Sequence, residues 1–139
     1  MATTTATLTL SSADLTGDAL SLSTTSTLTE AGNNTGLSQT TGLTRKTYTS
    51  AVTTQEAILD ASLYTDDEAH KVYVKNLSTT AAEFVTIFIG ATEVGRLYAG
   101  DFMFIPWSAD TTVTAADIDI TTSAPNMTIE YMVFVQTFA

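Results

Sequence analysis

Alternation of apolar and polar side chains with a period of two is the feature that most constrains this fold. Residues 71–76 (KVYVKN) place Val72 and Val74 on one face of an extended chain, and Tyr73 with its two neighbouring lysines on the other. This is the pattern of a β-strand with one buried face. Residues 84–89 (FVTIFI) are almost all β-branched or aromatic, which also favours a strand. The chain is therefore predicted to be built from strands.

Turn residues separate these runs and set the expected architecture. Gly90 and Gly100 each follow a strand-like run, and Pro106, which lacks an N–H donor, is expected to end the run before it. Residues 55–63 (QEAILDASL) fit a short strand and a short helix equally well. The expected strands lie at 6–10, 19–23, 27–29, 57–59, 71–76, 84–89, 93–97, 101–105, 111–114, 117–121 and 127–138. A spacing of about 8–12 residues between strands predicts an all-β fold, an antiparallel β-sandwich of jelly-roll type.

Threonine and serine distinguish the N-terminal part of the chain. Together they make up roughly three residues in ten, about double the ordinary usage. Alternation of Thr or Ser with Leu at 6–10, 19–23 and 27–29 predicts half-buried strands, but large apolar residues are sparse before residue 50. We therefore expect a Thr/Ser-rich N-terminal arm or set of edge strands at 1–50, ordered by contact with a neighbouring subunit, and a compact β-sandwich domain at 51–139.

Composition argues against most kinds of chemistry. The 139 residues contain no cysteine and one histidine, His70, so a Ser-His-Asp relay would have to use His70 and a His-rich metal centre cannot form. Five Lys and Arg against fifteen Asp and Glu give a formal charge of −10, which disfavours binding to nucleic acid or to an anionic membrane. No apolar run is long enough to span a membrane. We expect a protein that is not an enzyme and that needs no cofactor.

Clustered carboxylates are the candidate metal sites. Asp66, Asp67 and Glu68 are consecutive and offer oxygen ligands for a cation such as Ca²⁺, or they form a solvated turn. Asp117 and Asp119 fall on one face of an expected strand, as a carboxylate pair or as ordinary solvent-facing charges. A separate carboxylate, Asp101, follows a glycine, where its side chain is expected to accept hydrogen bonds from nearby backbone N–H groups.

Three features suggest an interaction surface. Arg45 and Lys46 are the only adjacent basic pair, able to dock on an acidic partner or simply solvated. Trp107 is either a core aromatic or an interface anchor. The last strand is apolar on both faces, so it is buried on two sides or forms a subunit interface. Its candidate interface residues are Tyr131, Val133 and Val135.

The alternation also predicts the hydrophobic core, up to a shift of one residue that would exchange the two faces of a strand. The expected core comprises Val72, Val74, Phe84, Ile87, Ile89, Leu97, Phe102, Phe104, Ile129, Tyr131 and Val133.

The segment 71–107 resembles small structural proteins of tailed-phage virions. The segments that carry the resemblance are KVYVKNLST, VTIFIG and GRLYAGDFMFIPW, in which a strand ending in K-N-L-S/T is followed by a hairpin and an L-x-A-G-[DE]-F-x-x-x-P turn. Proteins of this type include capsid cement or decoration proteins and tail or neck accessory proteins, all without catalysis. The resemblance implies a location in the virion, assembled in the host cytoplasm, with the major capsid protein or other virion proteins as partners and a homotrimer as the expected oligomer.

Two classes of function follow from the sequence. The first is a virion structural protein, either a capsid cement subunit that bridges neighbouring major capsid proteins or a tail, neck or fibre component. The second is a carbohydrate-binding β-sandwich, in which Trp107, Tyr98 and Tyr64 would stack on sugar rings while Asp101 or Asp67 accepts hydrogen bonds. Exposure of these aromatic rings near a carboxylate would favour the second class.

Overall fold

The protein is an all-β molecule. Its structure, a computed structural model, describes residues 4–14, 19–29, 37, 39–65, 69–109 and 116–136, and 63% of these described residues lie in strands. The elements are β1 (Thr4–Ser12), β2 (Leu20–Leu28), β3 (Gln39–Thr40), β4 (Thr44–Tyr48), β5 (Glu56–Leu59), the 3₁₀ turn η1 (Ala61–Leu63), β6 (Ala69–Asn76), β7 (Phe84–Ile89), β8 (Thr92–Tyr98), β9 (Phe102–Trp107), β10 (Ile118–Thr122) and β11 (Met127–Gln136). The strand expected at 111–114 lies outside the described residues.

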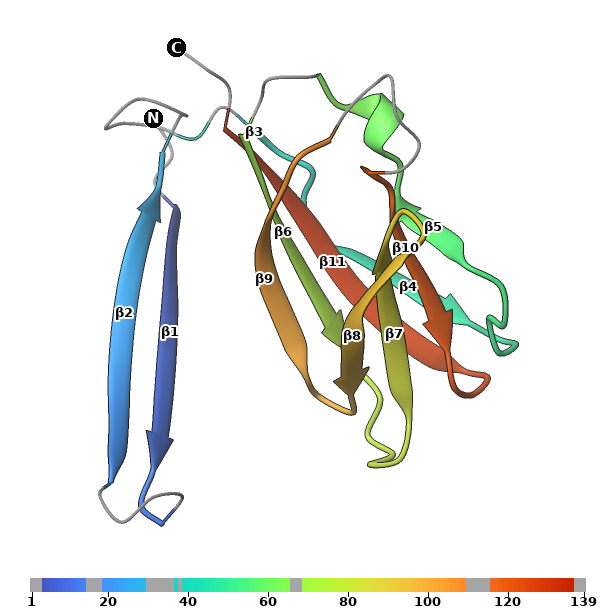
Figure 1. Cartoon of the computed structure of the whole chain (residues 1–139), viewed down its shortest axis with the longest axis horizontal. Coiled ribbons are helices and arrows are strands. Elements are labelled where there is room, and N and C mark those ends of the chain that lie inside the picture. The colour runs from blue at the N-terminus through green and yellow to red at the C-terminus, as the bar shows by residue number, and fades with distance from the viewer. Residues whose placement is uncertain are drawn as a thin grey trace.

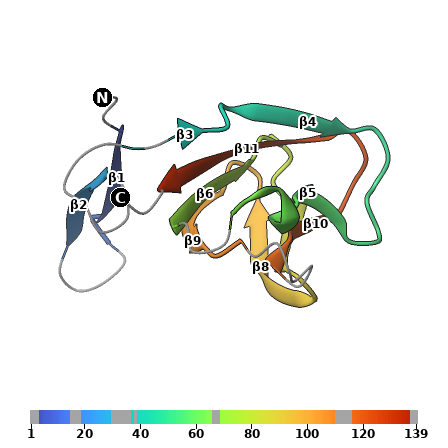
Figure 2. The same cartoon turned by 90° about the horizontal axis from the view of Figure 1, so that it is seen from above.

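Strands β4 to β11 form a two-layered sandwich, and all of their pairings are antiparallel (Figures 1 and 2). One sheet has the order β5-β10-β7-β8, and the other has β11 between β6 and β4, with β9 beyond β6 and the short β3 also paired to β11. Eight strands divided between two sheets in this order have the topology of a jelly roll. The predicted fold class is confirmed.

The core lies between the two sheets. Val72 and Val74 of β6 are fully buried, as are Ile129 and Val133 of β11, and Ile87 of β7 packs from the opposite layer. These five residues were predicted from the alternation. Further buried side chains complete the core: Tyr48, Ile58, Leu59, Ala61, Val85, Trp107, Ala109, Ile118, Ile120, Met127 and Val135.

The predicted register is wrong for the most aromatic runs. Phe102 and Phe104 of β9 are 54% and 36% exposed, because Met103 and Ile105 pair with the inward-facing valines of β6 and take the core positions. Phe84 is likewise only partly buried and lies against Tyr98. In these runs both sets of alternate residues are apolar, so the sequence pattern does not identify the inward face.

Pro106 does not end its strand, contrary to expectation. β9 continues through Pro106, which pairs with Lys71 of β6, to Trp107. β9 is the edge strand of its sheet, where a missing N–H need not interrupt the ladder. Residues 55–63 combine both of the open alternatives, since β5 is followed directly by the turn η1.

The N-terminal part divides at a different place from the predicted boundary at residue 50. β1 and β2 pair over nine residues each and form a hairpin of their own, which stands beside the sandwich at the left of Figure 1. β3 and β4, however, pair with β11, and Tyr48 belongs to the core. The arm therefore ends before β3, because β11 is long enough to pair with β6 along one edge and with β3 and β4 along the other.

Asn76 ties together the turns at one end of the sandwich. Its side chain is fully buried and donates to the Leu97 carbonyl at 3.0 Å, while its amide oxygen accepts from the Ser78 N–H at 2.9 Å. Its backbone N–H donates to the Asp101 carbonyl, and its carbonyl accepts from Gly100 N–H. The Asp101 carboxylate accepts from the Tyr98 N–H at 2.9 Å, as predicted for a turn aspartate. The turns at residues 76–78 and 98–101 thus meet at one buried amide side chain.

Candidate interaction surface

The outward face of the sheet that contains β9, β6 and β11 carries an unusual number of aromatic side chains. Tyr73 pairs across strands with Phe104 and packs near Phe102, at a ring separation of 6.5 Å. Phe104 makes an edge contact with Phe134 of β11, at 5.9 Å. We call Tyr73, Phe102, Phe104 and Phe134 the aromatic face. Exposed apolar clusters of this kind mark interaction sites in soluble proteins.

Basic residues surround the aromatic face. Arg45, Lys71 and Lys75 lie on the same side of the sheet, since their cross-strand partners are Glu130, Phe134 and Phe102. A chain with only five basic residues thus places three of them here. The face is locally cationic on a protein whose formal charge is −10.

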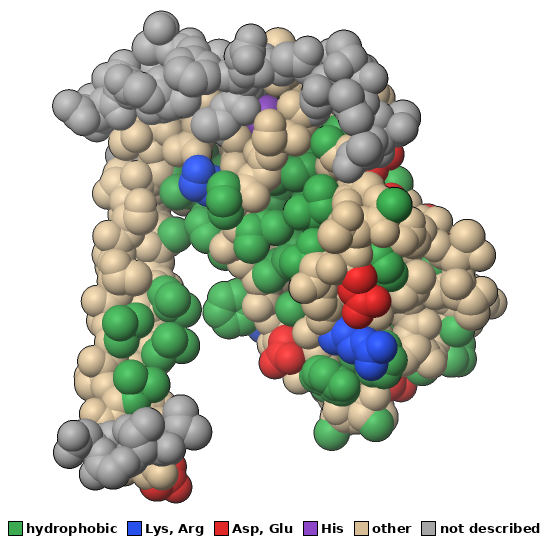
Figure 3. Space-filling model, viewed as in Figure 1, with side chains coloured by type: hydrophobic (Ala, Val, Ile, Leu, Met, Phe, Trp, Pro, Cys, Tyr) green, Lys and Arg blue, Asp and Glu red, His purple; other side chains and the backbone are tan. Residues whose placement is uncertain are grey.

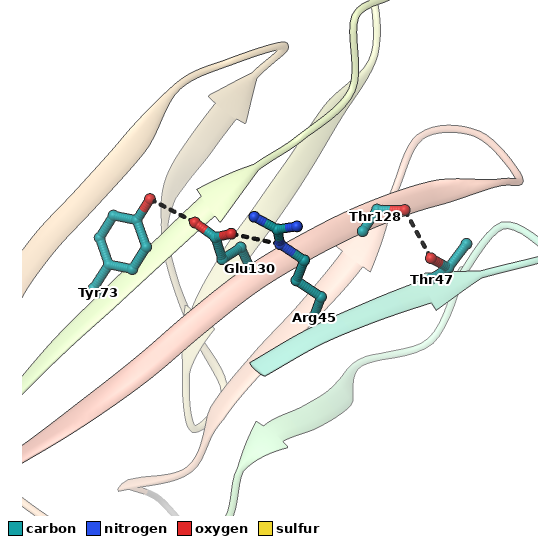
Figure 4. A network of polar contacts seen from close by, with 5 residues as sticks. All are labelled: Arg45, Thr47, Tyr73, Thr128 and Glu130. Atoms are coloured by element: carbon teal, nitrogen blue, oxygen red, sulfur yellow. Dashed lines mark hydrogen bonds and ion pairs between the residues drawn. The ribbon is translucent and has the colours of Figure 1, made fainter. Parts of the chain in front are cut away.

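A polar network fixes part of this rim (Figure 4). Glu130 of β11 is almost buried; its carboxylate accepts from Arg45 Nε at 2.7 Å and from the Tyr73 hydroxyl at 3.1 Å. Thr47 and Thr128 share a hydroxyl hydrogen bond of 2.8 Å farther along the same pair of strands. The network holds the Tyr73 ring and the Arg45 guanidinium in place at the edge of the aromatic face.

The same contacts shift two pKa values in opposite directions. The hydrogen bond from Arg45 lowers the pKa of the Glu130 carboxyl, and the Tyr73 hydroxyl acts in the same direction. Burial raises the pKa of the Tyr73 phenol, and its bond to Glu130 adds to that effect. Glu130 is therefore ionised and Tyr73 is neutral at physiological pH, which preserves the network.

The hairpin presents a second apolar surface. In the β1–β2 register, Leu10 pairs with Leu22, and Leu8 and Leu20 lie on the same face. All four leucines are between 38% and 46% exposed. We call them the leucine face. The opposite face carries hydroxyl side chains, with Thr7 bonded to Thr25 at 2.9 Å. Strands are confirmed here, but the runs predicted at 19–23 and 27–29 form the single strand β2, and the four leucines stay partly exposed.

A groove of about 670 Å³ separates the two apolar surfaces. Ala6, Leu8 and Leu10 line it from the hairpin, and Tyr73, Phe102 and Phe104 line it from the sandwich. Figure 3 shows hydrophobic side chains on both sides of this opening. Leu8 and Leu10 of the leucine face therefore lie opposite the aromatic face across an open groove.

The base of the hairpin is fixed to the sandwich. Leu28, the last residue of β2, is 4% exposed, and the next carbonyl, of Thr29, accepts from Gln136 Nε2 at 2.5 Å. Gln136 also accepts from Lys71 Nζ at 3.0 Å. The hairpin is thus anchored where it joins the sandwich, and its leucine face lies toward the far end.

The predicted basic pair is split between two surfaces. Arg45 faces outward onto Glu130 with its side chain 65% exposed. Lys46, on the other side of β4, forms an ion pair with Glu56 at 2.5 Å, and that hydrogen bond raises the pKa of Lys46. Adjacent residues of a strand point in opposite directions, so the two do not act as one docking site.

Most of the remaining predicted interface residues belong to the core. Val133, Val135 and Trp107 are between 0% and 4% exposed, and Tyr131 is partly buried against the same cluster. Val133 and Val135 point inward because they alternate with Met132 and Phe134 of β11, and Trp107 does so because it alternates with the exposed Pro106 and Phe104 of β9. The prediction assigned the wrong face of β11 to the interface. Phe134 lies on the outward face, where a partner can contact it, while Val133 and Val135 are buried in the core.

The three aromatic residues expected to bind a sugar do not form a platform. Trp107 is buried, and its indole N–H donates to the Ala116 carbonyl at 2.6 Å. It packs edge-on against Tyr64 and His70, at ring separations of 5.2 and 5.7 Å. Tyr98 lies elsewhere, beside Phe84. A buried indole has no free face for stacking, and His70, at 1% exposure, sits inside this cluster.

Of the predicted carboxylate pair, Asp117 has a structural hydrogen-bond partner and Asp119 is partly buried. Asp117 accepts from the Ala61 N–H at 2.8 Å and so fixes the turn η1. Burial raises the pKa of Asp119, with a smaller contribution from Asp117. Asp66, Asp67 and Glu68 lie outside the described residues. Among residues 4–14, 19–29, 37, 39–65, 69–109 and 116–136 there is no group of three or more acidic or histidine side chains placed to hold a metal.

Sequence reasoning missed the two surfaces that the structure brings together. The aromatic face was concealed because Phe102 and Phe104 were assigned to the core. One sequence signal was available, because Tyr73 alternates with Val72 and Val74 and so lies on the same face of β6 as Lys71 and Lys75. Phe104 pairs with Tyr73 and therefore also faces outward. The leucine face had a signal too, since strands without any charge are unusual on a solvent-exposed hairpin.

Comparison with known proteins gives no assignment. No protein-family model, curated protein or solved structure matches the chain. In the part of the chain that the structure describes, no helix is long and apolar enough to cross a membrane.

Proposed function

We propose that the chain is a non-enzymatic structural protein of a tailed-phage virion, acting as a capsid cement or decoration subunit that bridges neighbouring major capsid proteins. The observation that carries the proposal is the pair of uncovered apolar surfaces, the leucine face and the aromatic face, displayed by a chain with few groups suited to catalysis. Surfaces of this kind suit permanent contacts in an assembly. The sequence resemblance over 71–107 supplies the virion context.

The fold is compatible with this role but does not select it. Jelly rolls occur in viral structural proteins and in lectins, and a fold shared by many functions says little about any one of them. The burial of Trp107 weighs against the lectin alternative, because it removes the main stacking ring of the proposed sugar platform. In a bridging role, the contacts with capsid proteins would be made by the exposed hairpin of β1 and β2 and by the outward face of the sheet that contains β9, β6 and β11.

The contacts made by these surfaces should be mainly apolar. The strands of the hairpin contain no ionisable side chain, and the aromatic face is basic only at its rim. Raising the ionic strength from about 0.05 to about 0.5 M shortens the screening length to a few ångströms. A bridge held by charge would release over that range, whereas an apolar bridge holds or tightens.

The test measures how much of this protein stays on purified particles across that salt range, and how well particles with and without it resist heating. We expect retention at high salt and a loss of heat resistance when the protein is absent. A variant lacking residues 1–26, which keeps the buried Leu28, should bind particles poorly while its sandwich stays folded. Release at moderate salt, or equal heat resistance without the protein, would refute the cement role and favour a tail, neck or fibre position.

A further inference from the structure

The hairpin of β1 and β2 keeps its apolar side partly exposed. Two antiparallel strands alone are marginal in water, and they need a third strand or a covering layer over their apolar side. Here the four leucines stay 38–46% exposed, and among the described residues the aromatic face lies across an open groove from Leu8 and Leu10. The far strand edges of β1 and β2 also have no partner strand among the described residues.

The chain's own sandwich does not cover the whole leucine face. Of the four leucines, Leu8 and Leu10 line the groove, but Leu20 and Leu22 do not. Leu22 pairs with Leu10, and Leu20 lies closer to the tip, at the end of the hairpin opposite the base that Leu28 and Thr29 attach to the sandwich. The base of the hairpin is anchored, whereas Leu20 and Leu22 stay 38% and 45% exposed and can pack on a surface of another molecule.

Charge favours a second copy of this chain as the source of that surface. Two copies that each carry a formal charge of −10 repel one another over most of their surfaces. The strands of the hairpin are uncharged, and the aromatic face carries Arg45, Lys71 and Lys75 at its rim. Contact between the uncharged hairpin of one copy and the basic-rimmed aromatic face of another adds no charge repulsion between these two surfaces.

We infer that the protein forms a homo-oligomer by exchange of hairpins, in which the leucine face of one copy packs on the aromatic face of a neighbour. The same two surfaces already face each other within one chain, so exchange makes a contact for which the sequence is already suited. This inference goes beyond the proposed function and does not rest on it, because it concerns the free protein before it meets any particle.

The first test is the mass of the purified full-length protein by light scattering coupled to size exclusion. We expect an oligomer. The double variant Leu10→Thr/Leu22→Thr, which places β-branched strand formers in this cross-strand pair, should weaken self-association roughly tenfold or more by removing two apolar anchors. The variant Phe102→Thr/Phe104→Thr should do the same from the other surface. Circular dichroism establishes that each variant is folded.

The second test identifies which surfaces touch. The chain has no cysteine, so introduced cysteines are unique. Leu10→Cys and Phe104→Cys are co-expressed as separate chains with different affinity tags and then oxidised, and we expect a disulfide-linked species that carries both tags. Thr9→Cys is the matched control, because Thr9 is exposed on the hydroxyl face of the same strand. It should cross-link to Phe104→Cys far less.

Four results would overturn the inference. These are a monomeric wild-type protein, an oligomer unaffected by the variants of either surface, a cross-link to Thr9→Cys as efficient as that to Leu10→Cys, and a cross-link confined to one chain when both cysteines are in the same molecule. The last result would show that the hairpin closes on its own sandwich.

Discussion

Replacing Asn76 by alanine should destabilise the protein more than any other single substitution of a polar residue within residues 71–107. The side chain is fully buried, donates to the Leu97 carbonyl at 3.0 Å and accepts from the Ser78 N–H at 2.9 Å, with a weaker bond of 3.4 Å to the Glu83 carbonyl. A buried polar group that loses its partner costs about 1–3 kcal/mol. With two well-formed bonds removed, we expect a loss of about 2–4 kcal/mol in the free energy of unfolding.

The assay is urea denaturation together with a thermal melt, for Asn76→Ala and for Thr79→Ala as the control. Thr79 is three residues away and exposed, so its substitution should change stability by less than about 0.5 kcal/mol. For a domain of this size, 1 kcal/mol corresponds to a shift of about 3–5 °C in Tm. The Asn76 variant should therefore melt about 6–20 °C lower.

Asn76→Asp separates the hydrogen bonds from the loss of volume. An ionised aspartate keeps the acceptor for Ser78 but cannot donate to Leu97, and it introduces a charge in a site with no exposure. Burial raises its folded pKa above the unfolded value, so this variant should gain stability as the pH falls. Two results would contradict this reasoning: equal Tm values for Asn76→Ala and Thr79→Ala, or a stability of Asn76→Asp that does not change with pH. Either would show that the buried Asn76 side chain does not hold the turns together.

Three further expectations concern the two layers and the hairpin. Glu130→Gln removes the ion pair with Arg45 and should cost about 1 kcal/mol near neutral pH. Because the folded pKa of Glu130 is lowered, the stability that its carboxylate contributes is present above the unfolded pKa and is lost as the pH falls through the folded pKa. The denaturation curves of wild type and variant should therefore differ at neutral pH and converge at acid pH. Ile87→Ala, at 1% exposure, should cost about 3–5 kcal/mol, whereas Phe104→Ala, at 36%, should cost about 1 kcal/mol or less in a dilute sample; equal losses in urea titrations would contradict the corrected register. Deletion of residues 1–26 should leave the melting transition of the sandwich cooperative, and its disappearance would show that the hairpin is part of the folding unit.

Local pattern was sufficient where polar and apolar residues alternate strictly. In β6 the lysines mark the outward face, so Val72 and Val74 were assigned correctly, and so were their partners in β11. In β9 both alternate sets are apolar, and the strand register, which depends on pairing with β6, decides that Met103 is inside and Phe104 outside. Pro106 was misjudged for a related reason, because its tolerance depends on β9 being an edge strand.

Local sequence pattern was also insufficient to locate the candidate interaction surface. The sequence predicted strands in the arm, but it left Trp107, Val133 and Val135 open between core and interface, and the structure places all three in the core. An apolar residue fits an interior and an interface equally well, since both exclude water. Only the position of the second sheet distinguishes them.

The sequence by itself determined that this protein is built from strands, that it carries a net negative charge and that its turns lie at Asn76, Gly90 and Gly100, because period-two alternation and backbone preferences are local properties. The tertiary structure decided which faces meet. It ended the arm before β3, turned Phe102 and Phe104 toward the leucine face and buried Trp107. The physical reason is that burial depends on which strands become neighbours, and strand pairing joins residues that are far apart in the chain.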